Sequence, residues 1–438
     1  MENKKYKNIA LISGVEPHRT ILEKKLLNFF LNKDEKSLIV AGKPAELLDI
    51  ENINNVTIVS HLEDAELAEA LQNAENIYCR SGYSTLMDLH ALGIKSANLI
   101  PTPGQTEQEY LAEHFEKKGF CMVKQNEFII EKNAAVGKIA VVTGANGGFG
   151  FFIAKKLAEQ GAKVVFACRN EQKARSAMQK ISAELPHAQL DFIPLDLGDF
   201  SSVKNFAQEY KNRYQYIDIL INNAGILFVP HKTTKDGFEQ IFQTNYLGHF
   251  LLTNLLLPMF PNKKTSKIVT QSSVMYKFGK IHFDDLNLTR NYLLYKTNEK
   301  KLTFYSKWTA YAQSKLASTL FALELQRRLA AQGSNIQSVL AHPGVSMETN
   351  ILKNQFIRKL ARGFCSVFAQ SADKGAMPAV VAALSAEVKG GDFIGLDGFL
   401  QGKGAPVKIA IAKKAADKAV AKRLWEISDF KTKIKQKK

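Results

Sequence analysis

The sequence predicts an α/β protein in two parts, a smaller α/β lobe followed by a doubly wound parallel sheet. Short apolar runs rich in β-branched residues alternate with helical patterns along most of the chain. In the second part a glycine-rich turn joins such a run to a helix, and the net charge changes sign between the parts. This alternation is typical of parallel sheets that carry helices on both faces.

The length and composition exclude several classes of protein. A chain of 438 residues suits two or three domains of about 100–200 residues each, and 45% apolar with 23% charged residues is ordinary for a globular protein. The four cysteines lie far apart without a C-x-x-C pair, so we expect neither disulfides nor a metal site. The longest apolar run, Phe250–Phe260, has about half of the ~20 residues that span a bilayer. With no signal peptide evident, a cytoplasmic location is the expectation.

The charge distribution predicts the domain boundary. The chain holds 59 basic and 42 acidic residues, of which residues 1–134 hold 15 and 20, so the remainder holds 44 and 22. We therefore expect domains at 1–134 and 137–430, followed by a basic tail at 431–438. The tail is either a solvated terminus or an electrostatic contact for a membrane or nucleic acid. No nucleic-acid-binding motif is present, so no nucleic-acid partner is expected.

The pattern of the second part predicts strands that alternate with helices. Strands are expected at Lys138–Val142, Lys163–Ala167, Gln189–Pro194, Tyr216–Ile221, Lys267–Gln271 and Asn335–Leu340. Longer helices are expected at Phe200–Tyr214, Gly237–Met259 and Trp308–Ala331. The result is a Rossmann-type sheet, whose ligands bind at the carboxyl ends of the strands.

A glycine cluster follows the first of these strands and precedes a helix. Glycines allow a tight turn and close approach to a pyrophosphate, and the helix then directs free N–H groups at the phosphates. A tight turn without a ligand is the alternative for a glycine cluster taken alone. In this setting a nucleotide site is favoured, with these candidate contacts: Thr143, Gly144, Asn146, Gly147, Gly148, Phe149 and Gly150.

Further motifs follow in a fixed order at the predicted strand ends and helices. They are Asp196-Leu197, Asn222-Asn223-Ala224-Gly225, Asn245, Ser272-Ser273, Tyr311-Ala312-Gln313-Ser314-Lys315 and His342-Pro343-Gly344. With the glycine turn, this set resembles the short-chain dehydrogenase/reductase family, over about 137–430. Within that family the chain looks most like the retinol-dehydrogenase and protochlorophyllide-reductase-like branch. The resemblance implies cofactor contacts from Asp196, Leu197, Asn223, Ala224, Gly225, Tyr311, Lys315, Pro343 and Gly344, and a homo-oligomer.

The catalytic set can also be argued from its chemistry. Tyr311 and Lys315 are four apart on a predicted helix and so emerge on one face. A tyrosine titrates near ~10, and a nearby ammonium together with the nicotinamide ring should lower that pKa and favour the phenolate. Tyr311 could then exchange a proton with a carbonyl or alcohol oxygen. The family pattern adds Ser273 on the substrate oxygen, with Ser272 as a competitor, and Asn245 in the proton path.

The end of the second strand predicts the cofactor. Enzymes that use NAD usually have an acidic residue there, which accepts hydrogen bonds from the ribose 2′-hydroxyl. This chain has Cys168-Arg169-Asn170, and the Arg169 guanidinium suits a 2′-phosphate. NADP is therefore expected, and the alternative is a solvent-facing Arg169 with NAD accepted.

Two further features concern the substrate. Thr349 in the loop after His342 is a weak candidate contact, because relatives reach their threonine one residue sooner. The amphipathic segment Ile351–Gln370 is either a mobile lid over an apolar small molecule or a plain surface helix.

The first part predicts its own parallel sheet, with strands at Asn8–Ile12, Ser37–Ala41, Val56–Val59 and Asn76–Cys79. Together with Pro101-Thr102-Pro103-Gly104-Gln105-Thr106-Glu107-Gln108, the stretch resembles the C-terminal, donor-nucleotide lobe of family 28 glycosyltransferases. The resemblance implies possible contacts for a UDP-sugar at Ser13, Gly14, Ser81, Gly82, Asp88 and Gln108.

The leading hypothesis is an NADP-dependent enzyme that interconverts a carbonyl and an alcohol on an apolar small molecule, carried by 137–430. The acceptor lobe of family 28 enzymes would precede Met1, so sugar transfer by this chain is not expected. The alternative is a nucleotide-sugar-binding remnant fused to a reductase of secondary or regulatory role.

Overall fold

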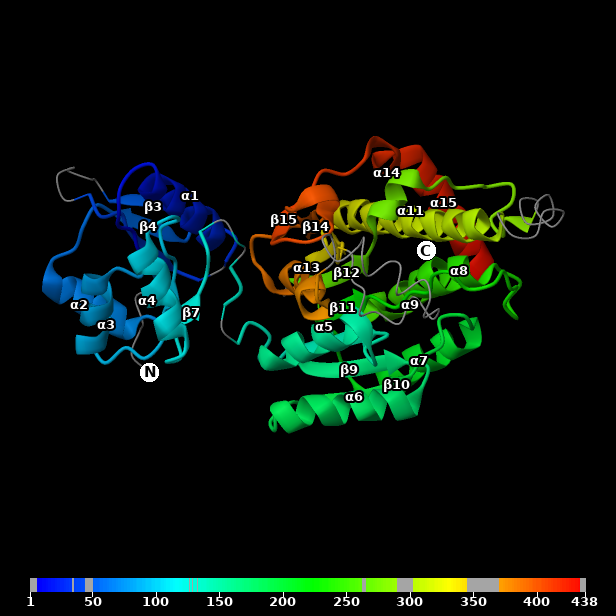
Figure 1. Ribbon diagram of the computed structural model, residues 1–438, viewed down its shortest axis with the longest axis horizontal. Coiled ribbons are helices and arrows are strands. Elements are labelled where there is room, and N and C mark those ends of the chain that lie inside the picture. The colour runs from blue at the N-terminus through cyan, green and yellow to red at the C-terminus, as the bar shows by residue number, and fades with distance from the viewer. Residues whose placement is uncertain are drawn as a thin grey trace. The chain divides into compact units, whose positions relative to one another are not determined.

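The computed structural model describes residues 6–33, 35–43, 50–125, 127, 129–131, 133–261, 265–289, 302–344 and 370–433 (Figure 1). The chain forms two compact units. The first contains Met1–Lys132 and Ser385–Glu387, and the second contains Asn133–Leu384 and Val388–Lys438. Each unit has its own sheet and its own hydrophobic core.

The first unit is a seven-stranded sheet in the order β3-β4-β2-β1-β5-β6-β7. Its strands are β1 (Asn8–Leu11), β2 (Ser37–Val40), β3 (Glu51–Ile53), β4 (Val56–Val59), β5 (Asn76–Cys79), β6 (Asn98–Leu99) and β7 (Cys121–Met122). Its helices are α1 (His18–Phe30), α2 (Asp64–Asn73), α3 (Tyr83–Ala91) and α4 (Thr106–Glu116). All neighbouring strands are parallel except β3 and β4, which pair antiparallel.

A partly buried polar cluster lies at the edge of the core of this unit. The Tyr78 hydroxyl donates to the Glu131 carboxylate at 2.5 Å, and the Lys33 ammonium forms an ion pair with the same carboxylate. Phe29 and Phe30 pack edge-on against the Tyr78 ring. The segment that leads to the second unit is thus part of the first unit's fold.

The second unit is an eight-stranded sheet in the order β10-β9-β8-β11-β12-β13-β14-β15. Its strands are β8 (Ile139–Thr143), β9 (Lys163–Cys168), β10 (Leu190–Pro194), β11 (Ile219–Asn222), β12 (Ser266–Gln271), β13 (Ile336–Ala341), β14 (Phe393–Leu396) and β15 (Pro406–Lys408). The strands are parallel except β15, which pairs antiparallel with β14. The predicted doubly wound parallel sheet is confirmed, with an antiparallel edge strand, β15, that was not predicted.

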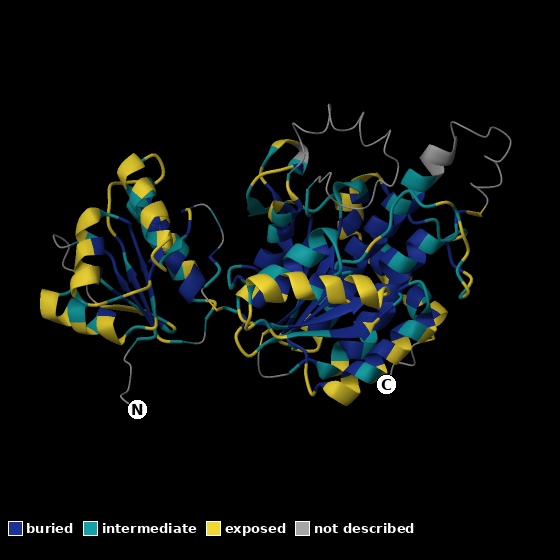
Figure 2. Ribbon diagram, turned by 60° about the horizontal axis from the view of Figure 1, so that its bottom comes forward, coloured by how far each residue is buried: buried dark blue, intermediate teal, exposed yellow. Residues whose placement is uncertain are grey.

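Helices cover both faces of this sheet. They are α5 (Gly148–Glu159), α6 (Glu171–Glu184), α7 (Phe200–Arg213), α8 (Gln240–Phe242), α9 (Gly248–Leu256), α11 (Leu302–Ala331), α13 (Ala372–Leu384), α14 (Lys413–Ala416) and α15 (Lys418–Thr432), with short 3₁₀ segments η2 (Leu257–Met259), η3 (Val274–Phe278) and η4 (Phe399–Gln401). Figure 2 shows buried strands at the centre and exposed outer helix faces. The continuous apolar runs of the strands reflect this burial on two sides.

The long helix predicted from Gly237 to Met259 is not continuous. It begins at Gln240, and the turn η1 (Gln243–Leu247) is a π-helix that contains Asn245. Gly248 follows at once, where a Cβ atom would lie 2.4 Å from the Leu197 carbonyl oxygen. The π-turn inserts a residue and so rotates Asn245 relative to a regular helix, a feature often found at functional sites.

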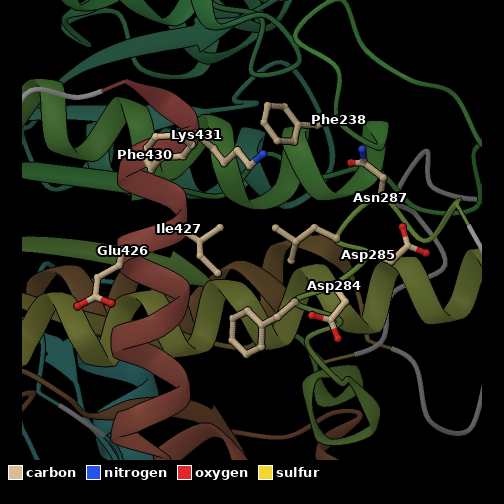
Figure 3. Close-up of a pocket in the computed structure, with 10 residues that line it drawn as sticks. Phe238, Asp284, Asp285, Asn287, Glu426, Ile427, Phe430 and Lys431 are labelled. Carbon is tan, nitrogen blue, oxygen red and sulfur yellow. The ribbon is translucent and has the colours of Figure 1, made fainter.

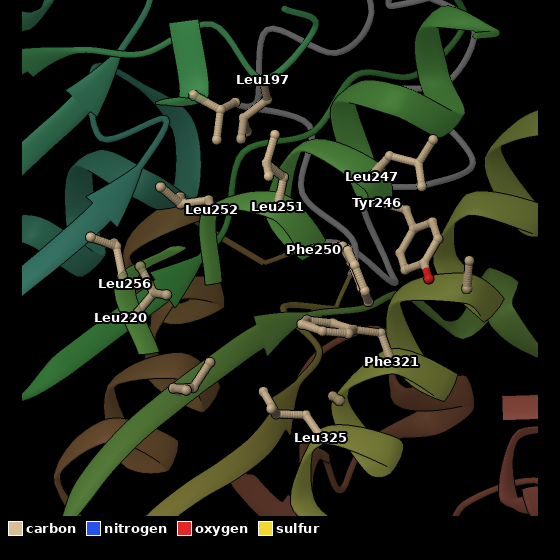
Figure 4. Close-up of a cluster of buried hydrophobic side chains, with 14 of the residues drawn as sticks. Leu197, Leu220, Tyr246, Leu247, Phe250, Leu251, Leu252, Leu256, Phe321 and Leu325 are labelled. Atoms are coloured by element: carbon tan, nitrogen blue, oxygen red, sulfur yellow. The ribbon is translucent and has the colours of Figure 1, made fainter. Parts of the chain in front are cut away.

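The C-terminal helix α15 is part of the core of the second unit. The Trp425 ring packs edge-on against Phe250, with centroids 4.9 Å apart, and stacks on Phe321. Phe250 and Phe321 lie in the cluster that joins α9 to α11 (Figure 4). The apolar face of α15 therefore packs against α9 and α11 in the core of the second unit.

Candidate active site

The order of the strands defines where a ligand should bind in the second unit. From β8 the chain runs outward to β9 and β10, and then returns to β11 on the other side of β8. The carboxyl ends of β8 and β11 thus flank the switch point, where ligands of open α/β sheets bind. The predicted site residues of this unit follow these strands and their neighbours.

The glycine turn has the backbone geometry that the sequence predicts. Gly144 has φ +68°, and a Cβ atom on it would lie 3.1 Å from Ala224 Cα. A Cβ atom on Gly150 would lie 2.2 Å from the Gly144 carbonyl oxygen, so only glycine fits. Helix α5 begins at Gly148, next to Gly147 and Phe149, which directs its unpaired N–H groups toward the switch point. These features suit the pyrophosphate of a dinucleotide.

Thr143 joins the turn to the next strand end. Its hydroxyl oxygen accepts hydrogen bonds from the backbone N–H groups of Asn223 and Ala224, both at 2.9 Å. The Asn223 side-chain amide donates to the Thr143 carbonyl at 2.8 Å. The Cys168 thiol lies under the turn, where the backbone N–H groups of Gly144 and Asn146 contact it, while burial raises its pKa to about 12. The turn is thus held from two neighbouring strands.

Asn245 is positioned by hydrogen bonds from both sides. Its side-chain oxygen accepts from the Ile226 N–H at 2.8 Å, and its amide donates to the Ile226 carbonyl at 3.0 Å and to Ser314 Oγ at 3.1 Å. A Cβ atom on Gly225 would lie 3.4 Å from the Asn245 side-chain oxygen and 3.8 Å from Lys315 Nζ. The end of the Asn223–Gly225 motif therefore lies against two of the predicted catalytic residues.

Lys315 lies beside Tyr311 on α11. Its ammonium is 5.7 Å from the centroid of the Tyr311 ring and donates to the Gln271 carbonyl at 3.0 Å. Burial lowers the pKa of Lys315 to about 8. The cation is thus held at the end of β12 by a neutral acceptor, with protons left for a further partner.

The two serines at the end of β12 differ in surroundings. Ser272 Oγ is buried and lies 2.8 Å from Thr319 Oγ1 on the far part of α11. Ser273, which caps η3, hydrogen-bonds through its side chain with the Tyr311 hydroxyl. The structure therefore brings Ser273, and not Ser272, to Tyr311.

Among the groups of the protein itself, burial dominates the pKa of Tyr311. Burial raises the pKa above the ordinary value of a tyrosine, and the hydrogen bond from Ser273 lowers it by less. The Lys315 ammonium, at 5.7 Å from the ring, does not reverse this balance. Desolvation of the phenolate outweighs the nearby groups of the protein itself.

His249 is a site residue that the motif analysis missed. It is buried; its Nδ1 lies 3.0 Å from the Asn245 carbonyl oxygen and its Nε2 lies 2.9 Å from Thr143 Oγ1. Because a carbonyl oxygen only accepts, Nδ1 of His249 carries the proton and Nε2 accepts from the Thr143 hydroxyl. The other possible acceptor of the Thr143 hydroxyl is the Ile221 carbonyl, at 3.2 Å. Burial lowers the pKa of His249 to about 4, which keeps this tautomer neutral. His249 thus bridges the glycine turn and the Asn245 turn. Its position four residues after Asn245 was the available signal.

The residues expected around the adenine and its ribose lie near the ends of β9 and β10. Arg169 is 73% exposed, and its guanidinium lies 3.8 Å from the Asp196 carboxylate. Asp196 in turn accepts from the Gly198 N–H at 2.9 Å, and Leu197 is buried. So long and exposed an ion pair holds Arg169 weakly and leaves its donors available.

The loop after β13 closes the other side. Gly344 has φ +75°, and the Pro343 carbonyl accepts from the Gln370 amide at 3.1 Å. Gly375 of α13 fits between the Phe149 ring and the Pro343 carbonyl, with no room for a Cβ atom. The predicted contact Thr349 and the predicted lid, except Gln370, lie outside the described residues, as does most of the basic tail.

An apolar wall adjoins Tyr311. Ile241, Leu288 and Ala310 form a buried cluster with which Tyr311 packs, and Ile226 and Val229 complete it. A separate groove of about 560 Å³ lies farther along α15, with Phe238, Asp285 and Phe430 among its lining residues (Figure 3). None of the predicted catalytic residues lines that groove. The wall, and not the groove, adjoins the reactive groups.

The candidate nucleotide-sugar residues of the first unit differ in exposure. Ser13, Gly14 and Asp88 are exposed, Gly82 and Gln108 are partly buried, and Ser81 is buried. Arg80, which follows β5, is buried and donates to the carbonyls of His18 and Ile100 and to Gln125. Ser81 Oγ donates to the Gln108 carbonyl, and the Gln108 side chain accepts from the Thr102 N–H. Gly14 (φ +103°) lies beside Arg80, and the other candidates, Ser13, Gly82 and Asp88, lie at or after the ends of β1 and β5. The structure thus pairs Ser81 with Gln108 and leaves Ser13, Gly14 and Asp88 exposed.

Fold and site together define a dinucleotide-dependent oxidoreductase of the doubly wound class. Residues 138–284 match the family model for short chain dehydrogenases, and residues 11–135 match the C-terminal domain of glycosyltransferase family 28. Human retinol dehydrogenase 14 is 36% identical over 312 residues, which covers 67% of this chain and 85% of that protein. Human polyprenol dehydrogenase is 37% identical over 259 residues, covering 58% and 74%. The crystal structure of an uncharacterised protein from Mycobacterium paratuberculosis is 36% identical and superimposes with a TM-score of 0.55, covering 70% of this chain and 99% of that one.

The chain belongs to the short-chain dehydrogenase family and carries a glycosyltransferase family 28 C-terminal lobe before that domain. The second unit is an NAD(P)-dependent dehydrogenase that acts on CH–OH groups. No helix in the described part of the chain is long and apolar enough to cross a membrane.

Proposed function

We propose that the second unit interconverts a carbonyl and an alcohol with NADP, and that Tyr311 is the proton donor and acceptor. The observation that supports this most strongly is the convergence of Ser273 and Lys315 on Tyr311, beside the Asn245 turn. The cofactor supplies or accepts the hydride when bound. The protein's own groups have the other tasks, which are to hold the substrate oxygen and to move a proton to it.

In the reducing direction the Tyr311 hydroxyl gives its proton to the substrate oxygen, which Ser273 also contacts. The raised pKa of Tyr311 means that the hydroxyl is protonated at neutral pH, which suits a proton donor. In the oxidising direction Tyr311 must become a phenolate, and its burial opposes this. Lys315, held by the Gln271 carbonyl, places a cation close enough to favour the charged form once further positive charge is present.

We propose NADP because of the charge at the end of β9. Within the described part of the chain, the exposed Arg169 guanidinium has only a 3.8 Å contact with the Asp196 carboxylate. A 2′-phosphate would offer it two charge-assisted hydrogen bonds, which are stronger than such a contact. The glycine turn, with positive φ at Gly144 and no room for a Cβ atom at Gly150, fits the pyrophosphate.

We propose an apolar alcohol or aldehyde as the substrate. The wall of Ile241, Leu288 and Ala310 next to Tyr311 offers apolar contacts and no charge. The relatives named above are dehydrogenases of retinol and of polyprenol, both long apolar alcohols.

The test is a screen of NADPH oxidation over aldehydes, ketones, retinoids and polyprenals, with the wild type and Tyr311→Phe side by side. The exposed Tyr216→Phe is the matched control. We expect turnover by the wild type and Tyr216→Phe, and loss of about 10² or more in Tyr311→Phe with NADPH binding retained. Equal turnover by all three proteins on every accepted substrate would contradict the proposal.

A further inference from the structure

The second unit carries an exposed surface of lysines around one phenylalanine. We call it the basic-aromatic surface and define it as Lys277, Phe278, Lys280, Lys413, Lys414 and Lys418. All six residues are exposed, and the Phe278 side chain is 74% exposed. A side chain of this size exposed to that degree loses apolar contact unless another surface covers it.

Two segments distant in the sequence form this surface together. The Lys414 ammonium donates to the Gly279 carbonyl at 3.1 Å, and α14 contacts η3. The Tyr276 hydroxyl accepts from the Ala412 N–H at 3.0 Å and is buried beneath them. The surface is therefore built on a fixed base and is not a loose terminus.

In the described part of the chain, the lysines of this surface are not held in ion pairs. None of its lysines forms an ion pair with a carboxylate of the described residues. The acid nearest in sequence, Asp417, accepts hydrogen bonds from the N–H groups of Ala419 and Val420 as the N-cap of α15. Lysines that share a surface without ion pairs repel one another, and an anionic partner surface would reduce that repulsion.

The aromatic residue distinguishes between anionic partners. A lipid bilayer offers both anionic headgroups for the lysines and an apolar layer for Phe278, whereas the phosphate backbone on the outside of a nucleic-acid duplex offers only the charge. The position also suits a bilayer, because η3 begins directly after Ser273. A membrane bound there would lie next to the loop that reaches Tyr311.

We propose that the basic-aromatic surface docks the protein onto anionic phospholipid bilayers, with Phe278 inserted between headgroups. The docking is peripheral. It does not depend on the proposed activity, and vesicle binding is measured without turnover.

The test is sedimentation of the full chain with vesicles of phosphatidylcholine and phosphatidylserine at a molar ratio of about 7:3. Vesicles of phosphatidylcholine alone serve as the comparison. The variant Lys413→Ser/Lys414→Ser/Lys418→Ser removes three charges, and Phe278→Ser removes the apolar contact. The matched controls are Lys180→Ser/Lys204→Ser/Lys211→Ser, which removes three exposed helical lysines elsewhere on the unit, and the exposed Tyr216→Ser.

We expect the wild type to bind the anionic vesicles and to release them as salt rises. Each lysine near the surface should contribute roughly fivefold to the partition coefficient, so the first triple variant should lose about a hundredfold. Phe278→Ser should also weaken binding, and both controls should bind like the wild type.

Three results would overturn the proposal. One is no preference for the anionic vesicles, and another is an equal loss in the control triple variant, which would show that net charge alone acts. The third is unchanged vesicle binding by the Lys413/Lys414/Lys418 variant while its binding to a DNA duplex is lost. That result would assign the surface to nucleic acid.

Discussion

His249 should make the second unit lose stability in acid. In the folded protein its neutral ring donates to the Asn245 carbonyl and accepts from the Thr143 hydroxyl, in a site that burial keeps dry. Protonation would put a second N–H against a hydroxyl that already accepts from two backbone groups, and would bury a charge. The variant His249→Gln removes the titration while keeping a donor and an acceptor.

The magnitude follows from the two pKa values of His249. They are 6.5 for an ordinary histidine and about 4 in the folded protein. Between these values the unfolded chain binds more protons, so the free energy of unfolding falls as the pH drops below 6.5 and levels off below about 4. From pH 7 to pH 5 this group should cost the wild type about 2 kcal/mol more than His249→Gln. His342, whose pKa burial also lowers to about 4, titrates alike in both proteins and cancels.

The assay is urea unfolding followed by tryptophan fluorescence at a series of pH values. The chain has two tryptophans, Trp308 and Trp425, and both belong to the second unit, so the signal reports that unit. The exposed His187→Gln is the control and should follow the wild type. Parallel curves for the wild type and His249→Gln from pH 7 to pH 5 would refute the account of His249 as a buried neutral bridge.

Three further predictions concern other parts of the chain. Arg169→Asp should raise the Kd for NADPH at least tenfold, because the new carboxylate repels the 2′-phosphate, and should change the Kd for NADH little. The exposed Arg175→Asp is the control, and an equal loss of affinity for both cofactors would contradict the NADP proposal. Gly150→Ala should abolish NADPH binding in calorimetry, because its Cβ atom would lie 2.2 Å from a carbonyl oxygen; unchanged binding would show that the turn can shift. Glu131→Gln should lower the stability of the first unit by about 1–3 kcal/mol, seen as faster amide exchange in its central strands, with the exposed Glu69→Gln unchanged; equal exchange in both variants would remove the polar cluster from the core.

Local patterns were enough to predict the sheet and the residues that flank its switch point. The predicted apolar runs form β8 and β9, which are buried on both faces. The turn between them needs glycine because a Cβ atom on Gly150 would collide with the Gly144 carbonyl oxygen. Motifs of this kind depend on local backbone geometry, so their structure can be predicted from their sequence alone.

Long-range contacts could not be predicted in this way. The bridge made by His249 depends on the π-turn at Gln243–Leu247, which an ordinary helical pattern does not reveal. The raised pKa of Tyr311 depends on its burial by other segments, which its spacing to Lys315 does not reveal. The antiparallel edge strands β3 and β15 have three residues each, too few for a periodic signal.

The role that we propose for Tyr311 is to exchange the proton in an NADP-dependent reduction. The most direct measurement is the single-turnover rate of NADPH oxidation, with a saturating aldehyde that the wild type reduces, in the wild type and in Tyr311→Phe. Phenylalanine keeps the ring packing beside Ile226 and Val229 and removes only the hydroxyl that contacts Ser273. We expect unchanged NADPH affinity and a hydride-transfer rate lower by about 10² or more. A rate within a fewfold of the wild type at neutral pH would contradict this role.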